Sequence, residues 1–164
     1  MRTLILQRHA KSDYPTGVAD HDRPLSARGQ RDAHAAGVWL AARNFNPAQA
    51  LVSTAVRTRQ TWDVLQPYLP MTSVTWDSRI YEATATTLRR VLGDISDDVT
   101  SVILVGHNPG LEVLAASLAR GGSTSALAAM AQKYPTSAIA VVQSEKVWAQ
   151  FDEAELVEFA VPRG

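Results

Sequence analysis

The sequence predicts a three-layer α/β/α fold in the α/β class, with a mostly parallel sheet and one or more antiparallel edge strands. Two observations lead to this prediction. Over the first 120 residues, short apolar runs suited to strands alternate with segments whose apolar residues recur at helical spacing. Such alternation is typical of a parallel sheet covered on both faces. The last 28 residues are rich in strand-like runs, and these predict the edge strands.

The first half of the chain begins with a strand over residues 3–7, a short apolar run rich in β-formers. Ser26 then offers an N-cap for a helix over residues 27–43, where apolar residues recur at helical spacing. Residues 50–53 form a compact apolar run that predicts a second strand. A helix over residues 55–68 follows it.

The central elements continue the alternation. Pro70 ends the preceding helix, and the next strand is predicted over residues 73–76. A stripe of apolar residues at helical spacing predicts a helix over residues 88–95. Residues 101–105, Ser-Val-Ile-Leu-Val, are the clearest buried strand in the chain. A helix is predicted over residues 111–120.

The C-terminal part is predicted to add strands. Residues 121–125, Gly-Gly-Ser-Thr-Ser, read as a flexible turn, and residues 127–130 as part of a short apolar helix. Strands are expected over residues 137–143 and 156–161, with residues 147–151 as a third candidate between them.

Length, charge and composition limit the class of protein. The 164 residues are expected to form a single domain, residues 1–164, because that length supports one core and gives no argument for two. Sixteen basic and sixteen acidic residues balance, so neither nucleic acid nor a membrane is expected as a partner. The chain has no cysteine, which excludes disulfides and thiolate nucleophiles. Without a signal-peptide pattern or an apolar span near its start, a soluble cytoplasmic protein is expected; its oligomeric state is left open.

Three polar clusters follow three of the predicted strands. Arg8-His9 follows the first strand, Arg57 lies just after the second, and Gly106-His107-Asn108 follows the strand that ends at Val105. Ligands of open α/β sheets bind beyond the carboxyl ends of the strands. We therefore expect two arginines and two histidines to converge on one pocket.

These clusters resemble the motifs of the histidine phosphatase superfamily, which includes phosphoglycerate mutases and acid phosphatases. Arg8-His9 matches the family's Arg-His pair, and residues 53–61 match its Ser-x-Ala-x-Arg-Thr-x-x-Thr pattern. Residues 22–29 are similar to the segment that leads into the family's first helix. The Gly-His-Asn-Pro-Gly run at residues 106–110 and the short chain look most like the SixA-type phosphohistidine phosphatase branch. The resemblance covers nearly the whole chain and implies a phosphoglycerate mutase-like fold.

The resemblance implies that His9 is the nucleophile that takes the phosphoryl group, with Arg8, Arg57 and His107 binding its oxygens. Arginine suits this role because its planar, permanently charged donors match phosphoryl oxygens. His9 can attack only when unprotonated, and the neighbouring positive charge is expected to favour its neutral form. No metal and no cofactor is expected in this scheme.

Glu82 occupies the position that resembles the family's acidic proton donor. The loop after His9 offers other candidates for this role, and a leaving imidazole would make a strong acid less necessary. Possible substrate-binding residues are Asp20, His21, Arg23 and Asn108. The other candidate acids in the loop are Asp13, Asp20, His21 and Asp22.

Only 24 residues separate Glu82 from His107, which leaves no room for the long insertion that covers the site in many relatives. We therefore expect an open, shallow site for a bulky substrate. The first hypothesis is a metal-independent phosphatase that forms a phosphohistidine on His9 and acts on a protein phosphohistidine. A phosphatase for small phosphomonoesters or nucleotides is the second. The third is a phosphate-binding or phosphoprotein-binding module without turnover. A mutase is less favoured, because transfer back within one substrate benefits from an enclosed, dry site. A zinc or iron site is less favoured, because arginines beside the histidines repel a cation.

Overall fold

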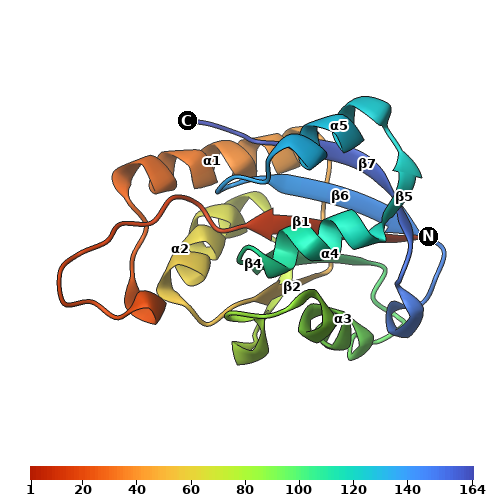
Figure 1. Ribbon diagram of the computed structural model, residues 1–164, viewed down its shortest axis with the longest axis horizontal. Coiled ribbons are helices and arrows are strands. Elements are labelled where there is room, and N and C mark those ends of the chain that lie inside the picture. Colours follow the sequence, from red (N-terminus) through yellow and green to blue (C-terminus); the bar gives the residue numbers. More distant parts are fainter.

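Seven strands form one sheet in the computed structural model, which describes all residues 1–164 (Figure 1). The order across the sheet is β3-β2-β4-β1-β6-β7-β5. The strands are β1 (Arg2–Arg8), β2 (Gln49–Val52), β3 (Ser73–Trp76), β4 (Ser101–Gly106), β5 (Ala119–Gly122), β6 (Ile139–Ser144) and β7 (Ala154–Ala160). The predicted α/β class and mostly parallel sheet are confirmed.

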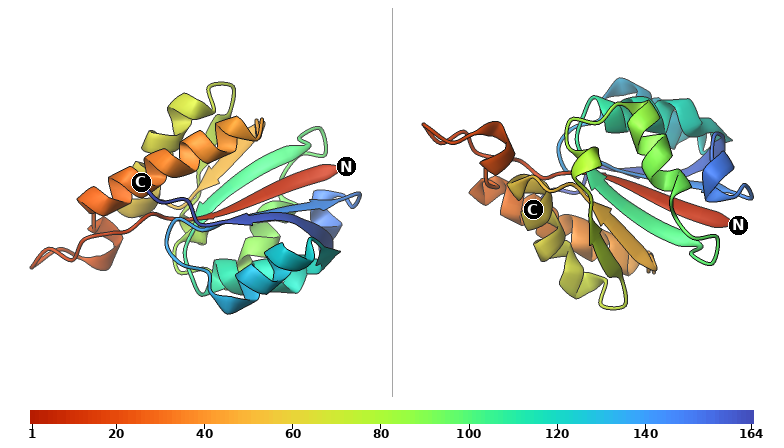
Figure 2. Two further views of the ribbon diagram at one scale, coloured as in Figure 1. Left: turned by 90° about the horizontal axis from the view of Figure 1, so that it is seen from above. Right: turned by 90° about the horizontal axis from the view of Figure 1, so that it is seen from below.

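Helices cover both faces of the sheet (Figure 2). Helices α1 (Ala27–Ala42) and α2 (Val56–Leu65) lie on one face, and α3 (Ala85–Gly93), α4 (Gly110–Leu118) and α5 (Thr124–Gln132) lie on the other. No helix is both long and apolar enough to cross a membrane.

Each face of the sheet has its own core because side chains alternate along a strand. On β1, Leu4 and Leu6 pack into a cluster of 24 buried residues with α3, α4 and α5. Ile5 points the other way, into a cluster of 12 buried residues with α1 and α2. A central parallel strand buried on both faces reads as a continuous apolar run, which explains why β1 and β4 are visible in the sequence.

The antiparallel strand lies inside the sheet rather than at its edge. β6 pairs antiparallel with both β1 and β7, while β7 and β5 pair in parallel. The edge strands are β3 and β5. β6 is buried over Ile139 to Val142, so its apolar side chains contribute to the two cores and favour an internal position.

Two local predictions in the C-terminal part are wrong. The predicted turn at 121–125 overlaps β5, which pairs with β7 although Gly122 has a φ of +116°. The candidate strand at 147–151 is instead a 3-10 turn, η4 (Trp148–Gln150), in which the Trp148 indole donates to the Val99 carbonyl at 2.6 Å. Short apolar runs do not distinguish a strand from another buried segment.

The carboxyl ends of β1, β2 and β4 meet at one edge of the sheet. Arg8 lies beside Gly106 in the parallel register of β1 and β4, and Val52 lies beside Val105 in that of β2 and β4. The segment between β1 and α1, which includes the 3-10 turn η1 (Asp20–Asp22), projects beyond this edge (Figures 1 and 2). The three polar clusters are therefore neighbours in space.

Candidate active site

His9 lies directly after β1 and is held in one orientation by the backbone. Its Nδ1 is 2.7 Å from the Ala10 carbonyl oxygen, so Nδ1 carries the proton and donates it to that oxygen. The other ring nitrogen, Nε2, makes no hydrogen bond within the protein. Burial is the main cause that lowers the pKa of His9 from 6.5 to about 3, and Arg57 and Arg8 contribute to this shift. The positive charge acts in the expected direction, but burial is the larger cause of the neutral form.

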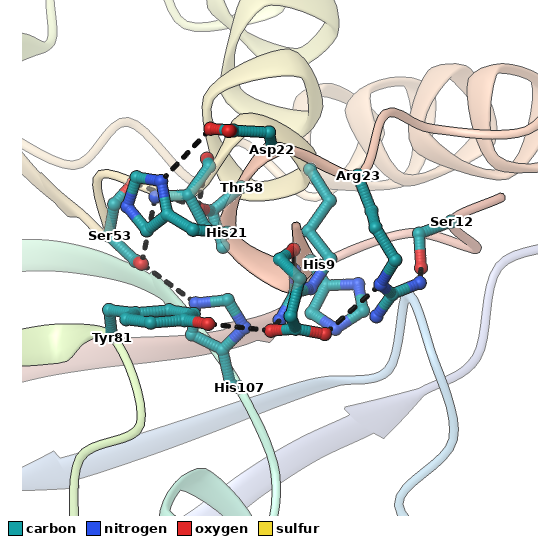
Figure 3. Close-up of polar contacts among 12 residues, drawn as sticks. His9, Ser12, His21, Asp22, Arg23, Ser53, Thr58, Tyr81 and His107 are labelled. Atoms are coloured by element: carbon teal, nitrogen blue, oxygen red, sulfur yellow. Dashed lines mark hydrogen bonds and ion pairs between the residues drawn. The ribbon is translucent and has the colours of Figure 1, made fainter. Parts of the chain in front are cut away.

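His107 follows β4 and faces His9, with 5.2 Å between the ring centroids (Figure 3). Its Nε2 is joined to the Ser53 hydroxyl by a hydrogen bond of 2.7 Å, and its Nδ1 is buried without a partner. Burial is also the main cause that lowers the pKa of His107, followed by the nearby His9 and Arg57. Two neutral imidazoles therefore stand side by side, each with one nitrogen unused.

Arg8 is held against the backbone after α5. Its Nη1 donates to the Tyr134 carbonyl at 2.9 Å, and the Asn108 amide donates to the same oxygen at 3.0 Å. The Nε atom of Arg8 is buried without a partner. Burial lowers the pKa of this guanidinium, with a smaller contribution from Arg57 in the same direction. Arg8 and Asn108 therefore share one acceptor, the Tyr134 carbonyl. Their proximity was predicted from their places at the ends of two adjacent strands.

Arg57 lies in the first turn of α2 and is 6 % exposed. Its Nη1 donates to the Asp20 carbonyl at 2.7 Å and its Nη2 to the Asp20 carboxylate at 3.2 Å, while its Nε is buried without a partner. A helix dipole disfavours a cation in the first turn. The location of Arg57 is therefore better explained by the binding of an anion than by a contribution to helix stability.

Asp20 is bound by three side chains at once. Its carboxylate accepts hydrogen bonds from the Tyr81 hydroxyl at 2.6 Å, from Arg23 Nε at 3.0 Å and from Arg57. The Tyr81 hydroxyl, ahead of the two guanidiniums, holds the pKa of Asp20 well below its usual range. With these contacts in place, Asp20 is held as a carboxylate at neutral pH.

The remaining loop candidates differ in their distance from the two imidazoles (Figure 3). Arg23 is anchored by Ser12 at 2.6 Å and points toward the site. His21 bonds the Thr54 hydroxyl at 3.0 Å and packs edge-on against the Tyr81 ring. The Asp22 carboxylate forms a hydrogen bond only with His21, at 3.5 Å. No group of three or more histidine, aspartate or glutamate side chains is arranged to hold a metal ion.

Glu82 lies on the rim of a groove of about 470 Å³ that His107 and Asn108 also line. Its side chain is exposed and makes no hydrogen bond, and its backbone has a φ of +53°. A non-glycine residue in this left-handed region stores strain that is often found at functional sites. Glu82 is close to the candidate site, but nothing in the protein orients its carboxylate.

The open, shallow site stays a prediction, and the two imidazoles themselves are buried. His9 and His107 are only 7 % and 8 % exposed. The loop after His9 reaches the site through the contacts of Asp20 with Arg57 and Tyr81, and the chain has no long insertion after Glu82. The sequence of residues 9–26, between β1 and α1, gives no sign that this loop makes these contacts.

Three functional contacts were not predicted from the sequence. Ser53 belongs to the matched motif, but its bond to His107 joins the ends of two different strands. Tyr81 binds Asp20 across 61 residues of chain. Tyr134 supplies its backbone carbonyl to Arg8. Only the position of Ser53 within the motif could have pointed to its contact.

The fold and this arrangement of side chains define a family. The model of the histidine phosphatase superfamily, branch 1, matches residues 4–150. The chain belongs to this superfamily. Within it, the solved structures it resembles include SixA proteins. The proposed phosphohistidine phosphatase SixA of Nakamurella multipartitia has a TM-score of 0.85 and 29 % identity, over 98 % of this chain and 96 % of that one.

Two further comparisons agree. The proposed phosphohistidine phosphatase SixA of Agrobacterium tumefaciens has a TM-score of 0.82 and 30 % identity, and the match covers 98 % of both chains. An uncharacterized protein of Mycobacterium tuberculosis (strain H37Rv) is 42 % identical over 160 residues, which cover 95 % of this chain and 99 % of that protein. The likeness to the two SixA proteins therefore extends over nearly the whole of both chains. The mycobacterial protein is more similar in sequence, but its name gives no substrate.

Proposed function

We propose that the protein is a metal-independent phosphatase that forms a covalent phosphohistidine on His9, and that its favoured substrate is a phosphohistidine on another protein. One observation carries this proposal. His9 is neutral, its Nδ1 is fixed by the Ala10 carbonyl and its Nε2 is unbound, while Arg8 and Arg57 lie near enough to affect its pKa. A nucleophile with a free electron pair beside two guanidiniums is suited to phosphoryl transfer.

The reaction has two displacements at phosphorus. The Nε2 lone pair of His9 forms an N–P bond while the bond from phosphorus to the leaving group breaks, and the leaving atom keeps the electron pair. Water then attacks the phosphorus, the N–P bond breaks, and inorganic phosphate and neutral His9 are released. The proton stays on Nδ1 and is donated to the Ala10 carbonyl through both steps. Arg8, Arg57 and His107 stabilise the charge on the phosphoryl oxygens.

The substrate class follows from the lack of an oriented proton donor. An alkoxide leaving group needs a positioned acid, and such help is typically worth about 10²- to 10⁴-fold. Asp20 is held as a carboxylate, and Glu82 is exposed without a hydrogen bond. A phosphohistidine that carries a proton on its second ring nitrogen leaves as a neutral imidazole, which is far less basic than an alkoxide. The names of the two SixA proteins, at 29 % and 30 % identity, support the same class.

A direct test is release of phosphate by the purified protein, in EDTA, from a phosphohistidine protein, small phosphomonoesters and nucleotides. His9→Ala is expected to abolish release from phosphohistidine. His34→Ala is the matched control, because His34 is an exposed histidine on α1 that contacts Tyr68 and lies outside the site. Acid quenching during turnover is avoided, since phosphohistidine is acid-labile; an alkaline quench is expected to trap label on His9.

Each alternative function has its own outcome. Release from esters alone, with a large loss in Glu82→Gln, would move the assignment to small phosphomonoesters or nucleotides. Phosphate binding without release from any substrate would indicate a binding module. Full activity of His9→Ala would overturn the covalent mechanism itself.

A further inference from the structure

The phosphoryl-binding arginine already has an anion bound to it. Both terminal nitrogens of Arg57 donate to Asp20, one to its carbonyl and one to its carboxylate. Of the three nitrogens of this guanidinium, only Nε has no partner, and it is buried. No other carboxylate forms a hydrogen bond with Arg57. The guanidinium has five N–H donors, and a ligand that takes the two donors bound by Asp20 replaces contacts that Asp20 makes.

We propose that the Asp20 carboxylate is an internal competitor for the substrate phosphoryl group, so that ligand binding exchanges one anion for another at Arg57 and releases the turn η1. The proposal concerns anion binding and goes beyond the proposed turnover. A carboxylate and a phosphoryl group use the same donors, because arginine binds both through its planar fork of N–H groups.

The surroundings of Asp20 make the exchange physically reasonable. Residues 13–20 are all exposed, and the segment projects from the edge of the sheet (Figures 1 and 2), so Asp20 can move without opening the core. Arg23 stays anchored by Ser12 and by the Asp13 carbonyl at 3.0 Å. The motion is thus confined to the exposed segment between Asp13 and Arg23, which includes η1.

The Asp20 carboxylate also offsets the positive charge of the pocket. Arg8, Arg23 and Arg57 all act on His9 and lower its pKa, and a pocket with three guanidiniums would hold free inorganic phosphate tightly. The Asp20 carboxylate neutralises part of this charge. The competing carboxylate therefore weakens the binding of the product phosphate. A substrate that makes further contacts outside the pocket can offset the free-energy cost of displacing Asp20.

Calorimetric titration with inorganic phosphate tests the proposal without any need for turnover. Asp20→Asn keeps the size of the side chain and removes its charge, so phosphate is expected to bind about tenfold more tightly, equivalent to about 1.4 kcal/mol. Asp22→Asn is the matched control, because Asp22 lies on the same turn and its carboxylate forms a hydrogen bond only with His21. Its phosphate affinity is expected to stay within about twofold of the wild type.

Equal or weaker phosphate binding by Asp20→Asn would overturn the proposal, because it would mean that Asp20 supports the arginine instead of competing for it. Asp20→Ala is a second variant that must show the same gain. The wild-type chain offers a test without substitution: phosphate is expected to speed hydrogen exchange of the Asp22 and Arg23 amides, which bond the Ala19 and Asp20 carbonyls in η1. Slower or unchanged exchange would contradict release of the turn. Tighter phosphate binding by a chain that hydrolyses nothing would leave this proposal standing while the proposed function failed.

Discussion

Mild acid is expected to destabilise the protein through its two buried site histidines. The pKa of His9 is about 3 in the folded chain against an ordinary 6.5, and that of His107 is also lowered. Below pH 6.5 the unfolded chain binds protons at these positions and the folded chain does not. Acid therefore favours the unfolded state, and stability falls as the pH drops from about 6.5 toward the folded pKa values.

The size of the effect follows from the shift. Each pH unit below the unfolded pKa removes about 1.4 kcal/mol per histidine from the free energy of unfolding. At pH 5 the loss is about 2 kcal/mol for His9, and about twice that if His107 behaves alike. Domains of this kind have a total stability of about 5–15 kcal/mol, so a loss of this size is easily measured.

Urea unfolding of the wild type at pH 7 and pH 5 gives the dependence, and the same experiment on His9→Asn isolates the contribution of one residue. The variant is expected to lose about 2 kcal/mol less than the wild type between the two pH values. His107→Asn is expected to behave similarly, and the double variant to add the two effects. Carboxylates that titrate in the same range cancel in these differences. An identical pH dependence in wild type and variants would refute the reasoning that burial keeps the imidazoles neutral.

Three further substitutions test the support around the site. Ser53→Ala leaves both nitrogens of the buried His107 ring without a protein partner, so thermal and urea unfolding should show a loss of about 1–3 kcal/mol, and phosphate affinity by calorimetry should fall. Asp32→Ala removes a carboxylate that is 1 % exposed and binds the C-terminal residues; a similar loss of about 1–3 kcal/mol and faster proteolysis of the C-terminus are expected. Gly110→Ala places a Cβ against the Ala83 carbonyl, so the start of α4 must shift and the melting temperature should fall, whereas an unchanged melting temperature would mean that the backbone there yields easily.

The fold was predictable where burial is strong and local. β1 and β4 are central strands whose residues are buried on both faces, and such strands are continuous apolar runs in the sequence. Ser26 was identified as the N-cap of α1 because its side chain type is specific for that position, and its hydroxyl accepts from the Gly29 amide at 3.0 Å. β5 was missed because glycines have a low strand propensity and its pairing with β7 depends on residues more than thirty positions away.

The candidate site was predictable only as far as topology brings residues together. Parallel strands place Arg8, His9, Arg57 and His107 at one edge of the sheet, so a sequence pattern is enough to gather them. How the loop after His9 folds back onto that edge depends on the Asp20 contacts with Arg57 and Tyr81, which span 37 and 61 residues. No periodicity or spacing encodes such contacts.

Burial and charge impose opposing requirements on this site, and the contacts of Asp20 connect them. A nucleophilic imidazole must be neutral, and burial keeps His9 so. Buried guanidiniums, however, carry a cost unless they are paired, and burial already lowers the pKa of Arg8. One carboxylate on an exposed loop supplies the missing charge to Arg57 without entering the core. Because that carboxylate binds through the donors that a phosphoryl group would use, the stability of the site without ligand and its affinity for ligand are opposed. A substitution that strengthens one is therefore expected to weaken the other.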